Sequence, residues 1–139
     1  MSMTLFLNIR DGESYQNNGE DHSAALYLQE PLDALAAKLN ITPLSAFYDD
    51  TDVRYNTDET GEFEDSEEGW PASAANWFPA EAVLSSVSVI LDHLQNNPNT
   101  LKTADGWKQD EVIEELTDFK LELERAAAQS KTVHLCIVM

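Results

Sequence analysis

The chain has 139 residues, 42% of them hydrophobic, and carries a formal net charge of −18. This length fits one domain over residues 1–139, and the hydrophobic fraction is typical of a chain that buries a core. Only eight Lys and Arg residues stand against 26 Asp and Glu residues. We therefore expect no binding to nucleic acid or to an anionic membrane surface, because both need clustered positive charge.

Signals for export, membrane insertion or disulfide formation are missing from the sequence. Cys136 is the single cysteine, so no intramolecular disulfide can form. The opening "MSMTLFLNIR" has no basic n-region, and its apolar run is too short for a signal peptide. No stretch approaches the roughly 20 apolar residues that span a bilayer. We therefore expect a cytoplasmic protein.

The first half of the chain predicts one strand and one regular helix. Residues 3–10 alternate apolar and mostly polar side chains, as a strand does, and residues 11–23 read as a loop. A helix is predicted from Pro31 to Asn40, followed by a short turn over 42–47 with Thr42 as its cap. Residues 48–76 show no sustained period and predict a long acidic loop. A third strand near "AALYL" (24–28) or "FYDD" (47–50) remains an alternative.

The second half predicts two long helices and a closing strand. Pro79 opens the first helix, and its apolar stripe is Val83, Val87, Ile90, Leu91 and Leu94. The second helix, in residues 108–130, has the stripe Val112, Leu116, Phe119, Leu123 and Ala126. "TVHLCIVM" then alternates as a strand with two largely apolar faces, so we expect both faces to be covered.

These elements predict an α+β fold. An isolated pair of strands is marginal in water unless helices cover it. We therefore expect the N- and C-terminal strands to pair in a small sheet that packs against three to four helices.

Half of the net charge lies in one short segment. Residues 49–68 contain ten acids and one base, Arg54, which gives −9 of the total −18. Such a segment is a solvated loop or a docking site for a basic partner. The partner-binding candidates are Asp58, Glu59, Glu62, Glu64, Asp65, Glu67, Glu68 and Trp70.

A calcium loop is a weaker interpretation of the same segment. In one frame its candidate ligands are Asn56, Asp58, Thr60, Glu62 and Glu67. Gly61 and Glu67 stand where such loops need glycine and a bidentate acid. However, Gly69 and Pro71 follow directly and prevent the exiting helix that the motif requires. We therefore predict no metal site and no cofactor.

Catalytic motifs are weak in this sequence. The three histidines do not share ligand spacing, and no glycine-rich phosphate loop occurs. His134 and Cys136 lie on one face of the closing strand, where packing explains them as well as nucleophilic chemistry does. We expect His134 to be half-buried and bonded locally. Trp77 is predicted to staple the start of the helix opened by Pro79, whereas Trp70 is the better candidate for a partly exposed contact.

Three stretches, "LDALAAKLNITPLSAF", "WFPAEAVLSSVSVILDHL" and "EELTDFKLELERAAAQSKTVHLCIV", together resemble an uncharacterised family of small acidic bacterial proteins. The resemblance covers most of the chain, but its motifs are structural. It implies a compact cytoplasmic bacterial domain, and it carries no functional residues over to this sequence.

The sequence therefore predicts a binding protein without catalysis that engages a basic protein, in one version as an immunity-type inhibitor. One alternative is a structural or housekeeping domain whose acidity serves solubility. A second alternative is a calcium-binding or enzymatic domain. The oligomeric state and the partner's identity cannot be predicted from the sequence.

Overall fold

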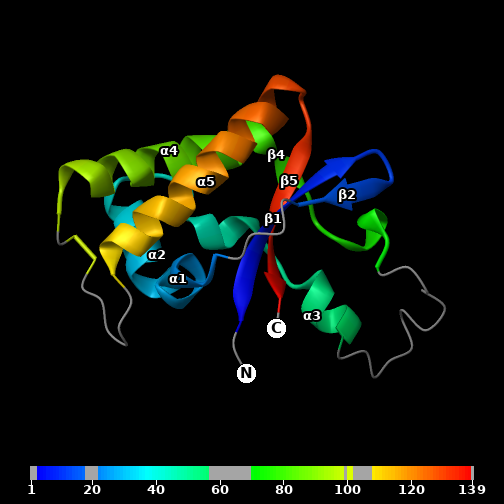
Figure 1. The fold of residues 1–139 in the computed structure, drawn as a ribbon, viewed down its shortest axis with the longest axis horizontal. Coiled ribbons are helices and arrows are strands. Elements are labelled where there is room, and N and C mark those ends of the chain that lie inside the picture. The colour runs from blue at the N-terminus through cyan, green and yellow to red at the C-terminus, as the bar shows by residue number, and fades with distance from the viewer. Residues whose placement is uncertain (1–2, 18–21, 57–69, 99, 102–107, 139) are drawn as a thin grey trace.

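The computed structural model describes residues 3–17, 22–56, 70–98, 100–101 and 108–138. A small sheet separates two layers of unequal thickness (Figure 1). The long helices cover one face of this sheet, and a short helix with the segment after the acidic run covers the other. Because the first and last strands pair, the two ends of the chain lie side by side.

The sheet is built on the terminal strands β1 (Thr4–Asp11) and β5 (Thr132–Val138), which pair antiparallel. The short strand β2 (Ser14–Gln16) extends the sheet beside β1. On the other edge of β5 lie β3 (Tyr48–Asp49), which is parallel to it, and β4 (Phe78–Pro79), which is antiparallel. The predicted α+β fold with paired terminal strands is confirmed.

The register of β1 and β5 sorts their side chains between the two layers. Leu5 lies opposite Ile137 and Leu7 opposite Leu135, and these residues belong to the core under the helices. On the other face, Phe6 lies opposite Cys136 and Asn8 opposite His134. Both faces of β5 are covered, as its apolar pattern predicts.

The helical layer consists of α1 (Ser23–Tyr27), α2 (Gln29–Lys38), α4 (Ala80–Asn96) and α5 (Gln109–Ala128). The predicted stripes of α4 and α5 are buried, which confirms both long helices. Asn40 ends α2 as predicted: it takes a positive φ of 58°, and Ile41 N–H bonds the Ala36 carbonyl 3.0 Å away. Ser130, with a φ of 54°, ends α5 in the same way.

Several short elements differ from the sequence-based expectations. Residues 11–23 are not all loop, because β2 forms a hairpin with β1 through a turn in which Gly12 takes a φ of +66°. The stretch 24–28 contributes to helix α1 rather than to a strand, whereas the strand alternative at 47–50 is confirmed by β3. Thr42 does not cap the following 3-10 turn η1 (Leu44–Phe47), whose cap position is Pro43.

The predicted loop 48–76 is also more ordered than expected. Besides β3, its described parts form helix α3 (Thr51–Asn56) and the 3-10 turn η2 (Ala72–Ala74). Residues 57–69 lie outside the described residues. None of the helices that the structure describes is long and apolar enough to cross a membrane.

Candidate functional site

The polar centre of the molecule is His134, on the face of the sheet away from the long helices. Its Nδ1 lies 3.0 Å from the Asn76 carbonyl oxygen, and its Nε2 lies 3.0 Å from Nδ2 of Asn8. A carbonyl can only accept, so Nδ1 carries the proton and Nε2 accepts from the Asn8 amide. The bond partners therefore define a neutral ring with a single tautomer.

The His134 ring is fully buried beside two tryptophans. Trp77 stacks on it with ring centroids 4.0 Å apart, and Trp70 lies 5.8 Å away. Burial lowers the pKa of His134 from its ordinary value, although the bond to Asn76 and the nearby Asp49 act in the opposite direction. The expectation of a half-buried, locally bonded histidine is wrong, because the covering segment 70–77 comes from a distant part of the sequence.

Asp49 holds the segment 70–77 through the backbone N–H of Asn76. Its carboxylate is buried, and it accepts hydrogen bonds from the backbone N–H of Thr51 at 2.9 Å and of Asn76 at 3.0 Å. Asn76 is thus held at both backbone groups, by Asp49 at its N–H and by His134 at its carbonyl. Asp49 also lies 4.0 Å from Nδ1 of His134. Buried polar groups that are satisfied in this way rigidify the structure around them.

Trp70 closes the site where the described chain resumes after the acidic run. Its side chain is only 4% exposed, stacks on Tyr15 at 4.2 Å and donates from Nε1 to Asp52 Oδ1 at 3.0 Å. The expectation of a partly exposed Trp70 is therefore wrong. The reason is that Tyr15, in the missed strand β2, supplies an aromatic surface on which the indole packs.

Trp77 has a structural position, but it does not staple helix α4. Its indole N–H donates to the Ala72 carbonyl at 2.7 Å, and its ring packs with the residues around Trp70 and Cys136. Phe78, the next residue, points to the other layer and meets Phe47 edge-on at 5.3 Å. The two neighbouring rings therefore lie in different layers, and Phe78 is the one that reaches the core beneath α4.

Cys136 lies beside His134 on the same face, but its thiol is not prepared for nucleophilic attack. The side chain is buried, and burial raises the pKa of this thiol to about 12. A thiolate, not a thiol, is the nucleophile. The His134 ring nitrogens are both engaged, so within the described residues this pair is arranged for packing and hydrogen bonding.

The other seven partner-binding candidates, from Asp58 to Glu68, lie outside the described residues. The same is true of the side chains in the alternative calcium frame, which begins at Asn56. The structure does place the two flanks of this acidic run. A hydrogen bond joins Asp52, in helix α3 before the run, to Trp70, directly after the run. Among the described residues, no group of three or more His, Cys, Asp or Glu side chains could hold a metal ion.

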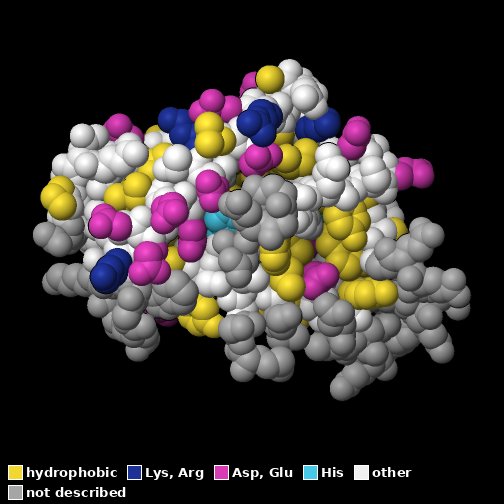
Figure 2. Space-filling view, viewed as in Figure 1, with side chains coloured by type: hydrophobic (Ala, Val, Ile, Leu, Met, Phe, Trp, Pro, Cys, Tyr) yellow, Lys and Arg dark blue, Asp and Glu magenta, His cyan; other side chains and the backbone are white. Residues whose placement is uncertain are grey.

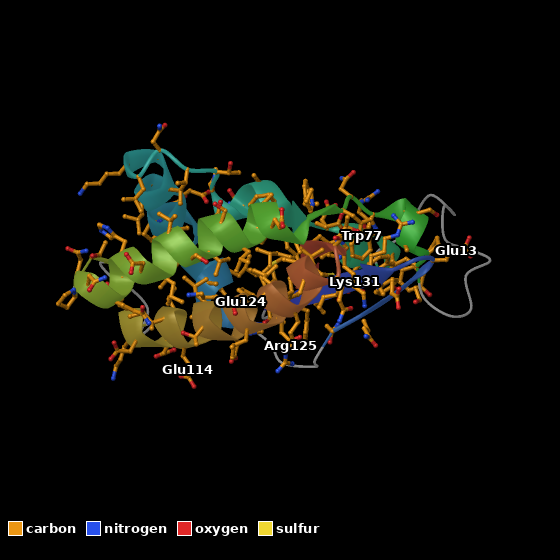
Figure 3. All side chains as sticks on the ribbon, turned by 90° about the horizontal axis from the view of Figure 1, so that it is seen from above. Glu13, Trp77, Glu114, Glu124, Arg125 and Lys131 are labelled. Atoms are coloured by element: carbon orange, nitrogen blue, oxygen red, sulfur yellow. The ribbon has the colours of Figure 1, made fainter. Side chains whose placement is uncertain are left out.

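An acidic surface covers α5, where Figure 2 shows acidic side chains gathered. Part of it has internal partners. The Glu115 carboxylate accepts from the N–H groups of Ala24 and Ala25, at 3.0 and 2.9 Å, and Asp118 lies 3.7 Å from Nε2 of the buried His22. Figure 3 shows Glu114 and Glu124 on α5 and Trp77 near the strands, away from Glu114.

Sequence reasoning missed Asn8, Asp49 and Asn76, which hold the His134 site together. One signal was available for Asn8: it is an uncharged amide at the centre of the strand, between Leu7 and Ile9, and such a residue needs a hydrogen-bond partner where it is buried. Asp49 and Asn76 carried no comparable signal, because both stand in a segment without periodicity.

Comparison with protein-family models, with curated proteins and with solved structures found no match for this chain. The resemblance to small acidic bacterial proteins therefore stays a prediction.

Proposed function

We propose that the chain is a non-catalytic binding protein whose acidic segment engages a basic protein partner. The observation that carries this proposal is the concentration of charge: residues 49–68 hold ten acids and one base. A surface with such an excess of one sign attracts partners of the opposite sign and accelerates their association.

The described flanks of the segment support this proposal. Asp49, Asp52 and Trp70 are tied to the sheet or to one another through hydrogen bonds, so the chain enters and leaves the run at fixed places. A binding segment whose ends are fixed loses less conformational freedom on association than one on a free tail. The acids between these flanks are the proposed contacts: Asp58, Glu59, Glu62, Glu64, Asp65, Glu67 and Glu68.

A specific version of the proposal is an immunity-type inhibitor of a nuclease. Carboxylates presented to a nuclease would occupy positions where the phosphates of its substrate bind, and charge steering would make association fast. This version predicts that the partner is a basic nuclease and that binding abolishes its activity. A binding protein that does not cover the nuclease's active site would leave its catalytic activity intact.

Two other functions compete with binding. A structural domain whose acidity serves solubility would have no partner that salt releases. A calcium-binding or enzymatic domain would show saturable calcium binding, or an activity lost on changing His134 or Cys136.

Capture from a cell extract with a pair of matched variants tests the binding proposal. In the first variant, the seven acids from Asp58 to Glu68 become Asn or Gln, which changes the formal net charge from −18 to −11. The second variant has the same net charge, but the substituted acids lie on the described surface: Glu13, Glu30, Glu81, Asp92, Asp110, Glu114 and Glu124.

We expect the intact chain and the second variant to retain the same basic protein at low salt, and the first variant to lose it. Equal retention by both variants would mean that total charge, not the acidic segment, determines binding. Retention of no basic protein by the intact chain would favour the solubility function. Circular dichroism shows whether both variants keep the fold.

A further inference from the structure

His134 joins two parts of the structure through its two ring nitrogens. Its Nε2 bond reaches Asn8 in β1, and its Nδ1 bond reaches Asn76 in the segment 70–77. We propose that His134 is a proton-sensitive latch: the neutral ring holds residues 70–77 against the sheet, and one proton taken up at Nε2 opens them. This inference does not rest on the proposed binding function.

A single proton breaks the latch because the Nε2 lone pair is the acceptor of one of its two bonds. After protonation, an N–H on the ring faces the NH₂ group of Asn8, so two donors oppose each other. To accept from the protonated ring, the Asn8 amide must turn over, and the Asn17 amide must turn with it, since Asn8 Oδ1 accepts from Nδ2 of Asn17 at 2.9 Å. Protonation therefore forces a chain of three hydrogen-bonded side chains to rearrange.

Among the described residues, the charged and titratable groups around the ring come from every element packed against it. They are Arg10 of β1, Tyr15 of β2, Asp49 of β3, Asp52 and Tyr55 of α3, and Cys136 of β5. Asp49, 4.0 Å away, favours the protonated ring, but its carboxylate already accepts two backbone hydrogen bonds. Asp52 accepts from the Trp70 indole, and Arg10 lies over Trp77, 5.8 Å from the ring centroid.

The balance of these groups favours the neutral ring in the closed state. Burial raises the pKa values of Tyr15 and Cys136, so both stay uncharged. Desolvation of the imidazolium outweighs the attraction of Asp49 and lowers the pKa of His134. A protonated His134 is therefore more stable in any state that lets water reach the ring.

The segment 70–77 is the part of the His134 environment that can open locally. β1 and β5 pair through seven successive positions, from Thr4–Val138 to Arg10–Thr132. By contrast, the segment contains only the three-residue turn η2, and its hydrogen bonds to other described elements run through Trp70 and Asn76. Local opening occurs where such contacts are few. Because Trp70 and Trp77 cover the ring, their departure exposes it.

Amide hydrogen exchange measured by NMR tests the latch at the Asn76 N–H, which donates to Asp49 in the closed state. We expect its protection factor to fall as pH decreases below about 6.5, by up to about tenfold per pH unit. The indole N–H signals of Trp70 and Trp77 should change over the same range. In His134→Gln the pH dependence should flatten, because glutamine can make both bonds but does not titrate. His93→Gln, on helix α4, is the matched control and should behave as the intact protein.

Protection at Asn76 that does not change between about pH 7.5 and pH 5 would overturn the latch, as would an equal pH dependence in His134→Gln. If His134→Gln does not fold, measurements on the intact protein test the proposal. The fall in Asn76 protection must then begin near the ordinary pKa of histidine, above the pH at which the imidazole signals of the closed state titrate, because burial lowers the pKa of His134 only in that state. Protection that begins to fall only at or below the pH of that imidazole titration would overturn the proposal.

Discussion

Trp70 donates a hydrogen bond from its indole nitrogen to the carboxylate of Asp52, with 3.0 Å between Nε1 and Oδ1. These residues stand on opposite sides of the densest acidic run in the sequence. The fold therefore brings the two flanks of the run together. Contacts such as this hydrogen bond offset the entropy that the chain loses when its two flanks are held close. The flanks meet beside the face of the sheet that holds His134.

Replacing Trp70 with Phe should destabilise the fold by about 1–3 kcal/mol. The variant loses the hydrogen bond to Asp52 and part of the stacking on Tyr15. Urea denaturation measures the change in the free energy of unfolding. Asp50→Asn serves as control, because Asp50 is exposed and pairs with Arg54 at the surface, so about 0.5 kcal/mol or less is expected. Equal stability of Trp70→Phe and the intact protein would contradict the burial of this indole.

Two neighbouring glutamates of α5 should differ in their effect on stability. Glu115 accepts two backbone hydrogen bonds at the start of α1, so Glu115→Ala should cost about 1–2 kcal/mol after allowance for its partial exposure. Glu114 is exposed, and Glu114→Ala should stay within about 0.5 kcal/mol of the intact protein. Thermal or urea unfolding of both variants checks this difference. Equal losses would show that Glu115 does not hold α1.

The Cys136 thiol should resist alkylation in the folded protein. Because burial raises its pKa to about 12, its thiolate fraction at pH 8 is on the order of a thousandfold below that of a free cysteine. Labelling with a thiol reagent should therefore be slow in buffer and fast in denaturant. Rapid labelling of the folded protein would show that the Cys136 thiol is accessible and reactive, contrary to this prediction.

Global stability should decrease as the solution is acidified below about pH 6.5. The unfolded chain protonates His134 at its ordinary pKa, whereas burial lowers that pKa in the fold. Between these two pKa values the unfolded state binds more protons, so the contribution is complete above about pH 6.5 and is lost as pH falls, by at most about 1.4 kcal/mol per pH unit. Urea unfolding at several pH values should give a shallower slope for His134→Gln. Identical slopes would count against a buried, neutral His134.

The elements with strong periodicity could be predicted from the sequence. The stripe from Val83 to Leu94 and the alternation of the terminal strands each fix a buried face, and the structure has both. The elements that were missed are short: β2 has three residues and α3 has six, too few to display a period. Their formation depends on tertiary contacts, such as the stacking of Tyr15 on Trp70.

The candidate site was harder to predict for the same reason. The acidic run from Asp58 to Glu68 is evident in the sequence. The environment of His134, by contrast, depends on residues from several separate segments. The antiparallel register puts Asn8 opposite His134, and the return of the chain after the acidic run brings Asn76 over the ring. Neither relation leaves a local pattern, so burial of His134 and Trp70 could not be read from their neighbours.

The association rate of the captured basic partner, measured across ionic strength, tests the proposed function most directly. For the intact chain the rate constant should fall steeply between about 50 and 500 mM NaCl, because salt screens the attraction between the acidic segment and the partner. The variant without the seven acids from Asp58 to Glu68 should associate slowly at every salt concentration, while the variant with seven surface acids replaced should keep most of the salt dependence. A rate that does not respond to salt, or that is unchanged by loss of the segment's acids, would contradict the proposal that this segment binds the partner.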